Sequence, residues 1–233
     1  MSTLMRTETK MTRRKTVLGP GYREQYLALF REALSCAARG ELDEVAIPSY
    51  THPNPLIRWL FWRRIEMALR MISGASGKAV LDFGCGGGVT FSYLASKGHA
   101  ITGVDPLAVP LARKSCDFME LESNLTESIE TIPEQSQDII LALDVLEHID
   151  DLDGTLASLA RVARRPCLLV ISGPTENLLY RAGRRLAGFS GHYHVSNIYD
   201  IETAVHRRGW LLDRSVSLYN PIPLFRVTRW WMG

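Results

Sequence analysis

Unbroken runs of apolar residues alternate with helical patterns from residue 78 to the end of the chain. Three of these runs are AVLDFG, DIILALDVL and PCLLVIS, which begin at residues 79, 138 and 166. A strand that is apolar on both faces is typical of a parallel sheet covered by helices on both sides. The pattern therefore predicts a doubly wound α/β fold with a mostly parallel sheet.

Four further runs bring the predicted sheet to seven strands. They are AITGVD at 100–105, CDFMEL at 116–121, WLLDRSVSLY at 210–219 and FRVTRWW at 225–231. Apolar residues at helical spacing lie between the runs. They predict helices over 90–97, 107–114, 152–164, 176–186 and 198–207.

Two more helices are predicted before the sheet, over 22–38 and 56–72, and they form an N-terminal helical extension. The segment IPSYTHPNP, rich in proline and polar residues, separates them. We interpret residues 19–74 as a helical lid and residues 75–233 as the domain that carries the sheet.

Charge is concentrated at the N-terminus. Residues 1–15 hold five basic side chains and one acidic side chain, whereas the rest of the chain holds 22 basic and 24 acidic residues. Because this larger part is close to neutral, nucleic acid is not an expected partner. The basic segment has no hydrophobic run after Arg13-Arg14, so we predict a disordered tail over 1–18 rather than an export signal.

The cysteines and the hydrophobicity bear on the cellular compartment. The four cysteines lie far apart at positions 36, 85, 116 and 167 and form no C-x-x-C pair. Free thiols in a cytoplasmic protein are therefore expected, and a zinc cluster is not. No apolar run reaches the ~18 residues that a membrane span needs. The sequence does not determine the oligomeric state.

The most informative stretch is VLDFGCGGGVT at residues 80–90, which places four glycines directly after a predicted strand. Glycines there let the backbone approach a ligand closely, because no Cβ intervenes. The dinucleotide fingerprint G-x-G-x-x-G fails at Val89. No lysine follows the glycines, so a P-loop for phosphate is excluded as well.

Two acidic residues describe the ligand further. Asp82, just before the glycines, would repel a pyrophosphate and would suit a ligand with an ammonium group. Asp105 ends the second predicted strand, where a carboxylate can accept both hydroxyls of a ribose. An adenosine that carries an amino acid satisfies both acids.

These residues resemble motif I and the acidic end of motif II of class I S-adenosylmethionine-dependent methyltransferases, which have a Rossmann-like fold. DIILALDVLEHIDD is similar to the motif IV region of the same family, especially in its small-molecule branch, which includes ubiquinone-biosynthesis O-methyltransferases. The resemblance covers residues 75–217. It implies that this part is a methyltransferase domain, that the cofactor is S-adenosylmethionine, and that a methyl group passes to a small molecule, most readily to a hydroxyl oxygen.

The resemblance also assigns parts of the cofactor to residues. It implies that the glycines lie against the cofactor, with Asp82 near the methionine part and Asp105 on the ribose. It further implies that Asn124-Leu125 lies near the adenine and that Leu143-Asp144 forms a floor; the family often has an acid in place of Asn124. The complete expected set is Asp82, Phe83, Gly84, Cys85, Gly86, Gly88, Asp105, Pro106, Asn124, Leu125, Leu143 and Asp144.

Asp144, Glu147 and His148 form a D-x-x-E-H cluster after the fourth predicted strand. We expect His148 to act as a general base or to line the acceptor pocket, without a metal. The alternative is a divalent cation held by the three side chains, because similar clusters bind metal in some O-methyltransferases.

An insertion near residues 174–197 is expected to cover the acceptor, because the related branch has its substrate-covering segment there. His192 and His194 in this insertion are candidate bases. Arg184 and Arg185 could hold an anionic group of the acceptor, although an exposed helix face would explain them as well.

Tryptophans lie among arginines near both ends of the predicted folded part, at positions 59, 62, 230 and 231. We expect the helix at 56–72 to bury its tryptophans as a lid over the cofactor. The alternative is peripheral contact with an anionic inner membrane surface, which would suit a lipid-like acceptor.

Two other functions remain as alternatives. One is RNA 2′-O-methylation, which the near-neutral charge makes less favourable. The other is a regulatory protein that binds the cofactor without turnover, against which the acids and His148 argue.

Overall fold

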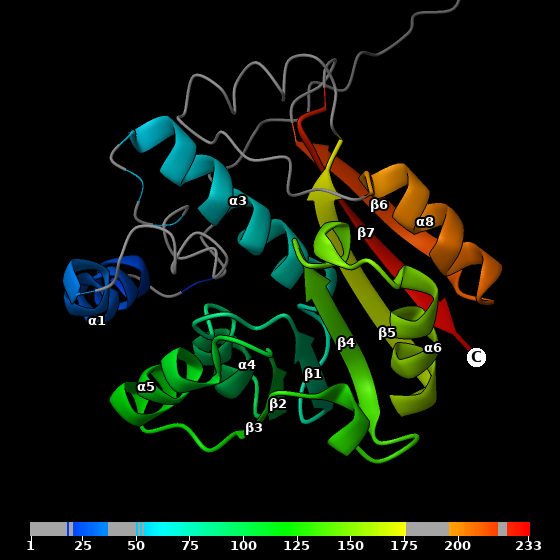
Figure 1. Cartoon of the computed structure of the whole chain (residues 1–233), viewed down its shortest axis with the longest axis horizontal. Helices are drawn as coiled ribbons and strands as arrows, with labels where there is room; N and C mark the ends of the chain where they lie inside the picture. The colour runs from blue at the N-terminus through cyan, green and yellow to red at the C-terminus, as the bar shows by residue number, and fades with distance from the viewer. Residues whose placement is uncertain are drawn as a thin grey trace, which may run out of the picture.

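The computed structural model describes Leu18, residues 21–36, Tyr50, His52, and residues 54–175, 196–218 and 223–233. Seven strands form one mixed sheet in the order β3-β2-β1-β4-β5-β7-β6 (Figure 1). The first five strands along the chain are parallel, and β7 pairs antiparallel with both β5 and β6. The doubly wound sheet of seven strands predicted from the sequence is thereby confirmed.

The strands follow the apolar runs closely, with one exception. Their bounds are β1 Ala79–Phe83, β2 Ala100–Val104, β3 Asn124–Thr126, β4 Gln137–Leu143, β5 Ala163–Pro174, β6 Leu211–Leu218 and β7 Phe225–Met232. The exception is CDFMEL, for which the prediction was wrong. Helix α5 continues through it to Met119, because Ala112, Ser115 and Cys116 are buried at helical spacing.

Helices cover both faces of the sheet (Figure 1). One layer holds α1 Tyr22–Cys36, α3 Pro55–Met71, α4 Phe91–Ser96 and α5 Val109–Met119; the other holds α6 Leu152–Val162 and α8 Ile198–Arg207. Two short 3₁₀ turns, Ile129–Thr131 and Leu146–His148, flank β4. Each layer packs its own apolar cluster against the sheet. Among the described residues, no helix combines the length and the apolar content that crossing a bilayer requires.

The order of the strands places a crevice between β1 and β4. From β1 the chain moves outward to β2 and β3, then returns to the other side of β1 as β4. Ligands of open parallel sheets bind at such a switch point, beyond the carboxyl ends of the strands. The loops that follow β1, β2 and β4 are therefore the place to look for a site.

Candidate functional site

The glycine loop after β1 adopts a backbone that only glycine adopts at low cost. Gly84, Gly86 and Gly88 have φ values of 73°, 51° and 74°. A Cβ built on Gly84 would lie 2.5 Å from a Cγ of Val145, the residue that follows Asp144 after β4. The loops after β1 and β4 therefore meet at the switch point with no room for a side chain on Gly84.

Asp105, directly after β2, binds the glycine loop. Its Oδ2 accepts a hydrogen bond of 3.0 Å from the backbone N–H of Gly86. Its Oδ1 accepts from the N–H groups of Leu107 and Ala108, at 3.0 and 2.8 Å. This carboxylate is thus fixed at the end of β2, beside the glycines, where the sequence predicted an acid for a ribose.

Asp82, the fourth residue of β1, lies beneath the loop and is 3% exposed. Its Oδ2 accepts a hydrogen bond of 2.5 Å from the hydroxyl of Thr90. Burial raises the pKa of this carboxyl to about 6; the Thr90 hydrogen bond lowers the pKa and nearby Asp105 raises it. A cationic group beside Asp82 would favour its ionised form.

Asp144 turns the chain after β4 in the left-handed region, with φ 56°. Its Oδ2 forms an ion pair of 2.5 Å with Arg64 of α3, and its Oδ1 accepts a hydrogen bond of 2.9 Å from the Ser172 hydroxyl. Sequence analysis had not assigned a role to Arg64. Its position among Trp62 and Ile65 on the apolar face of α3 could have singled it out.

The D-x-x-E-H cluster does not converge on one point. The carboxylate of Asp144 faces Arg64, Glu147 is buried, and His148 is exposed. In the part of the chain that the structure describes, no three His, Cys, Asp or Glu side chains gather as a metal site would require. His148 lies on the short turn after β4, on the same edge of the sheet as the glycine loop.

Aromatic side chains of α1 cover the outside of the glycine loop. The Tyr22 hydroxyl donates to the carbonyl oxygen of Val89 at 2.8 Å. A Cβ on Gly87 would lie 2.8 Å from both Tyr26 and Phe30, so these rings touch the loop. Trp62 of α3 packs edge-on against Tyr26, with ring centroids 5.7 Å apart.

The tryptophans divide into two groups. Trp62 and Trp230 are buried, whereas Trp59 and Trp231 are 44% and 40% exposed. The buried pair is part of the apolar clusters on the two sides of the sheet. The expectation that the helix at 56–72 buries its tryptophans is met at Trp62 and is wrong at Trp59, which lies on the solvent face of α3. The interpretation of α3 as a lid over the cofactor stays a prediction.

Asn124 and Leu125, which the resemblance assigns to the adenine, lie in β3, and that assignment stays a prediction. Asn124 is the first residue of β3, where it pairs with Thr102 in the middle of β2. The residue after β3 is Glu127, level with Asp105, because Thr126 pairs with Val104. Glu127 was not among the residues assigned from the sequence, because the resemblance pointed to Asn124-Leu125.

The remaining residues of the expected cofactor set have distinct surroundings. Phe83 and Leu143 are buried in the sheet, Leu125 is half-buried, and Pro106 is exposed. The Cys85 sulfur points toward Gly103, since a Cβ there would lie 3.1 Å from it. Burial raises the pKa of this thiol far above its usual range, so it stays protonated.

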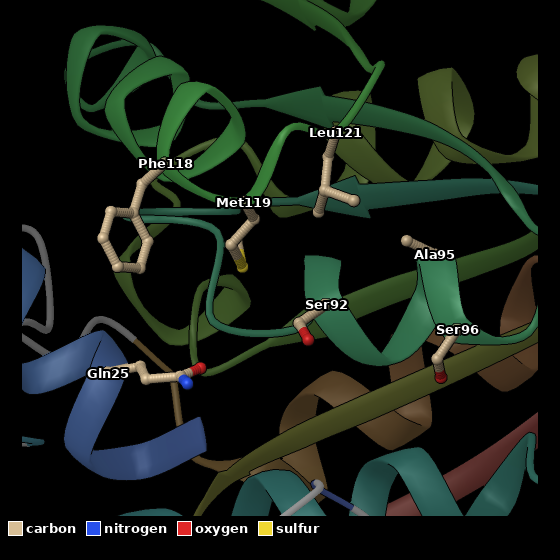
Figure 2. Close-up of a pocket in the computed structure, with 7 residues that line it drawn as sticks. All are labelled: Gln25, Ser92, Ala95, Ser96, Phe118, Met119 and Leu121. Carbon is tan, nitrogen blue, oxygen red and sulfur yellow. The ribbon is translucent and has the colours of Figure 1, made fainter. Parts of the chain in front are cut away.

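A shallow groove of about 590 Å³ lies between α1, α4 and the end of α5 (Figure 2). It is lined by Gln25, Ser92, Ala95, Ser96, Phe118, Met119 and Leu121. None of these residues is charged, and none belongs to the loops at the switch point. The groove is thus separate from the candidate site.

The insertion near 174–197 lies largely outside the described residues. His192 and His194, the two candidate bases, belong to this part, as do Arg184 and Arg185. Their roles stay predictions from the sequence.

Comparison with known proteins identifies the family to which the chain belongs. A family model described as "Methyltransferase domain" matches residues 57–214. The chain is 31% identical over 119 residues to a ubiquinone biosynthesis O-methyltransferase of Sodalis glossinidius, covering 48% of this chain and 45% of that protein. It is 32% identical over 129 residues to a demethylmenaquinone methyltransferase of Tropheryma whipplei, covering 53% of each. The chain thus spans about half the length of the curated relatives it matches.

Solved structures share the fold at low sequence identity. A magnesium protoporphyrin IX methyltransferase of Synechocystis superposes with a TM-score of 0.66 at 18% identity, covering 88% of this chain and 99% of that one. An N-methyltransferase of Bradyrhizobium japonicum superposes with a TM-score of 0.61 at 17% identity, covering 83% and 96%. The resemblance predicted from the glycine loop is confirmed: the chain belongs to the S-adenosylmethionine-dependent methyltransferase family.

Proposed function

We propose that the chain transfers a methyl group from S-adenosylmethionine to a hydroxyl oxygen of a small-molecule acceptor. The observation that carries the proposal is the link between Asp105 and Gly86 at the switch point of the sheet. It joins a ribose-type acid to a loop whose glycines have positive φ. Two of the solved neighbours are described as containing S-adenosylhomocysteine, in agreement with this cofactor class.

The residues present fit this cofactor. Val145 fills the place of a Cβ at Gly84, and the N–H groups of Gly84, Gly86 and Gly88 donate to Val104, Asp105 and Cys85. These contacts fix the loop, and the missing side chains of its glycines would let a ligand approach the backbone closely. Asp105 would hold the ribose hydroxyls, and Asp82 would face the ammonium group of the methionine part. Glu127, at the end of β3, is the residue we assign to the adenine side in place of Asn124.

The cofactor supplies, when bound, an electrophilic methyl group on a sulfonium sulfur. The chain's own contribution is to hold the acceptor oxygen in line with that methyl group and to exclude water. A base must take the hydroxyl proton as the oxygen attacks. We assign this role to His148, with His192 and His194 as the alternatives. Asp144 is unsuited to it, because Arg64 and Ser172 occupy both of its oxygens.

The names of the relatives indicate the acceptor class. One is an O-methyltransferase of ubiquinone biosynthesis, and another methylates demethylmenaquinone, as their names state. We infer an acceptor with a hydroxylated ring and an apolar or anionic substituent. Contact with a membrane surface would suit such an acceptor, and the exposed Trp59 is the described residue most suited to it.

The test is a methyl-transfer assay with S-adenosylmethionine and a panel of hydroxylated aromatic acceptors. Formation of S-adenosylhomocysteine together with an O-methylated product would support the proposal. Binding of S-adenosylhomocysteine without turnover on any acceptor would favour a regulatory role instead. Methylation of RNA ribose but of no small molecule would favour the other alternative.

The base is tested separately with the most active acceptor of the panel. His148→Gln should lower kcat about 100-fold or more and leave the affinity for S-adenosylhomocysteine unchanged. A normal kcat in this variant would transfer the role to His192 or His194. A lower affinity for the cofactor product with unchanged kcat would contradict the assignment altogether.

A further inference from the structure

A buried ion pair joins the N-terminal helices to the candidate site. The side chains of Arg64 in α3 and Asp144 after β4 are 3% and 11% exposed, and their charged atoms are 2.5 Å apart. Each charge alone would be costly in so buried a place, so the two side chains depend on one another. This pair spans the gap between α3 and the carboxyl end of β4.

The surroundings of Arg64 restrict where its guanidinium can point. It lies against the rings of Phe61 and Phe225, 4.5 Å from each centroid, and the two rings are in contact with each other, with centroids 6.1 Å apart. A side-chain hydrogen bond also connects it to Tyr50. An arginine that contacts two rings and also forms a hydrogen bond is restricted in orientation, and lysine, with its compact ammonium group, would not reproduce these contacts.

The ion pair with Arg64 also helps to fix the backbone conformation of Asp144. Its left-handed conformation is uncommon for a residue other than glycine, although Asp and Asn tolerate it better than most. Its carboxylate is held by Arg64 on one oxygen and by Ser172 on the other, and its N–H donates to the Ser172 carbonyl at 3.1 Å. The next residue, Val145, is the one that closes against Gly84.

We propose that Arg64 is a positioning residue that acts through Asp144 to set the distance between the β4 loop and the glycine loop. The sequence of contacts runs from Arg64 to Asp144, to Val145 and to Gly84. The two loops flank the crevice between β1 and β4, so their spacing controls the fit of the cofactor. This inference rests on the proposed function, since it assumes that the cofactor binds in that crevice.

The test is a double-mutant cycle read by calorimetric binding of S-adenosylhomocysteine to the full chain. We expect R64M and D144N each to weaken binding roughly tenfold. Asn keeps the left-handed backbone of position 144 accessible while removing the charge. Both changes break the same contact, so their effects on affinity should not add. The affinity of R64M/D144N for S-adenosylhomocysteine should be within about twofold of that of whichever single variant binds less tightly.

The matched control is R164M. Arg164 of β5 pairs with Asp138 at the amino end of β4, 3.1 Å apart, so this ion pair lies at the opposite end of β4 from Asp144. Its loss should leave the affinity unchanged. Thermal melting of each variant separates loss of fold from loss of binding, and if R64M does not fold, the cycle is run with R64Q, which also removes the charge.

Two results would overturn the inference. If the fold-losses of affinity of the two single variants multiply in the double variant, Arg64 contacts the ligand itself instead of acting through Asp144. Unchanged affinity in a folded Arg64 variant would mean that the ion pair only stabilises the fold. Failure of the wild-type chain to bind S-adenosylhomocysteine, by contrast, would count against the proposed function.

Discussion

The two helical layers that cover the sheet differ in chemistry. The layer of α1, α3, α4 and α5 buries aromatic rings together with two charged groups of α3, Arg64 and Glu66, and it covers the buried Asp82 of β1. The layer of α6 and α8 packs mainly aliphatic side chains, such as Leu156 and Val205, against the other face; the buried charged group next to it, Glu147, lies on the turn after β4 and not in either helix. Buried charges are costly to a fold, so a layer that contains them serves more than packing.

The difference follows from which layer reaches the glycine loop. Tyr22, Tyr26 and Phe30 contact the loop from outside, and Arg64 reaches the turn after β4. Arg23 of α1 pairs with the buried Glu66 of α3, which ties the two covering helices together. We therefore expect changes in the first layer to alter both stability and cofactor affinity, and changes in the second to alter stability alone.

The largest effect is expected when one core side chain is truncated in each layer. Phe30→Ala and Leu156→Ala remove side chains that are both 0% exposed. The free energy of unfolding should fall by about 3–5 kcal/mol for Phe30→Ala and about 2–5 kcal/mol for Leu156→Ala. Urea denaturation measures this loss, and calorimetry with S-adenosylhomocysteine should show weaker binding for Phe30→Ala alone. If the two folded variants bind S-adenosylhomocysteine with equal affinity, the first layer has no special effect on cofactor binding.

A comparison of two glycines tests the contact between the loops that follow β1 and β4. Gly84 and Gly98 both have positive φ, but only Gly84 has a neighbour in the place of a Cβ. Gly98→Ala should cost about 1–2 kcal/mol of unfolding free energy for the backbone. Gly84→Ala should cost about 1–3 kcal/mol more because of the clash with Val145, and should also weaken cofactor binding. A similar Tm for both variants would contradict the close contact.

The pH dependence of binding tests the charged group beneath the loop. The pKa of Asp82 is raised to about 6 by burial, and a bound ammonium group favours the ionised form. Affinity for S-adenosylhomocysteine should therefore rise with pH through 6 and level off above it, with roughly a tenfold difference between pH 5 and pH 8. Asp82→Asn should bind weakly and lack this transition, and a wild-type profile that is flat from pH 5 to 8 would refute the assignment.

The same pKa has the opposite consequence for the unliganded fold. A carboxyl whose folded pKa exceeds its unfolded value stabilises the fold at low pH, and this stabilisation is lost as pH rises from about 4 to 6. Asp82→Asn should therefore raise the Tm of the unliganded chain at pH 8 relative to wild type. Binding and stability then depend on Asp82 in opposite directions.

The smallest effect is expected at the groove of Figure 2. Phe118, which lines it, is 56% exposed and lies away from the loops at the switch point. Phe118→Ala should change the free energy of unfolding by less than about 0.5 kcal/mol. The affinity for S-adenosylhomocysteine should stay the same, and a clear loss would mean that this groove communicates with the crevice.

Much of this molecule could be predicted from short stretches of sequence. The glycine loop, the acids at 82 and 105 and the apolar strands are local patterns, because the backbone conformation of glycine and the burial of a central strand depend on neighbouring residues. The error at CDFMEL has the same origin. Six apolar and polar residues fit a strand or the end of a helix equally well, and only burial of Ser115 and Cys116 against the sheet selects the helix.

The sequence by itself determined the family, the α/β fold and the loop that would receive the cofactor. Only the tertiary structure paired Arg64 with Asp144, buried Trp62 while leaving Trp59 exposed, and placed Glu127 at the strand end in place of Asn124. The physical reason is sequence separation. The two members of the ion pair are 80 positions apart in the sequence, and their meeting depends on how α3 packs across the end of the sheet.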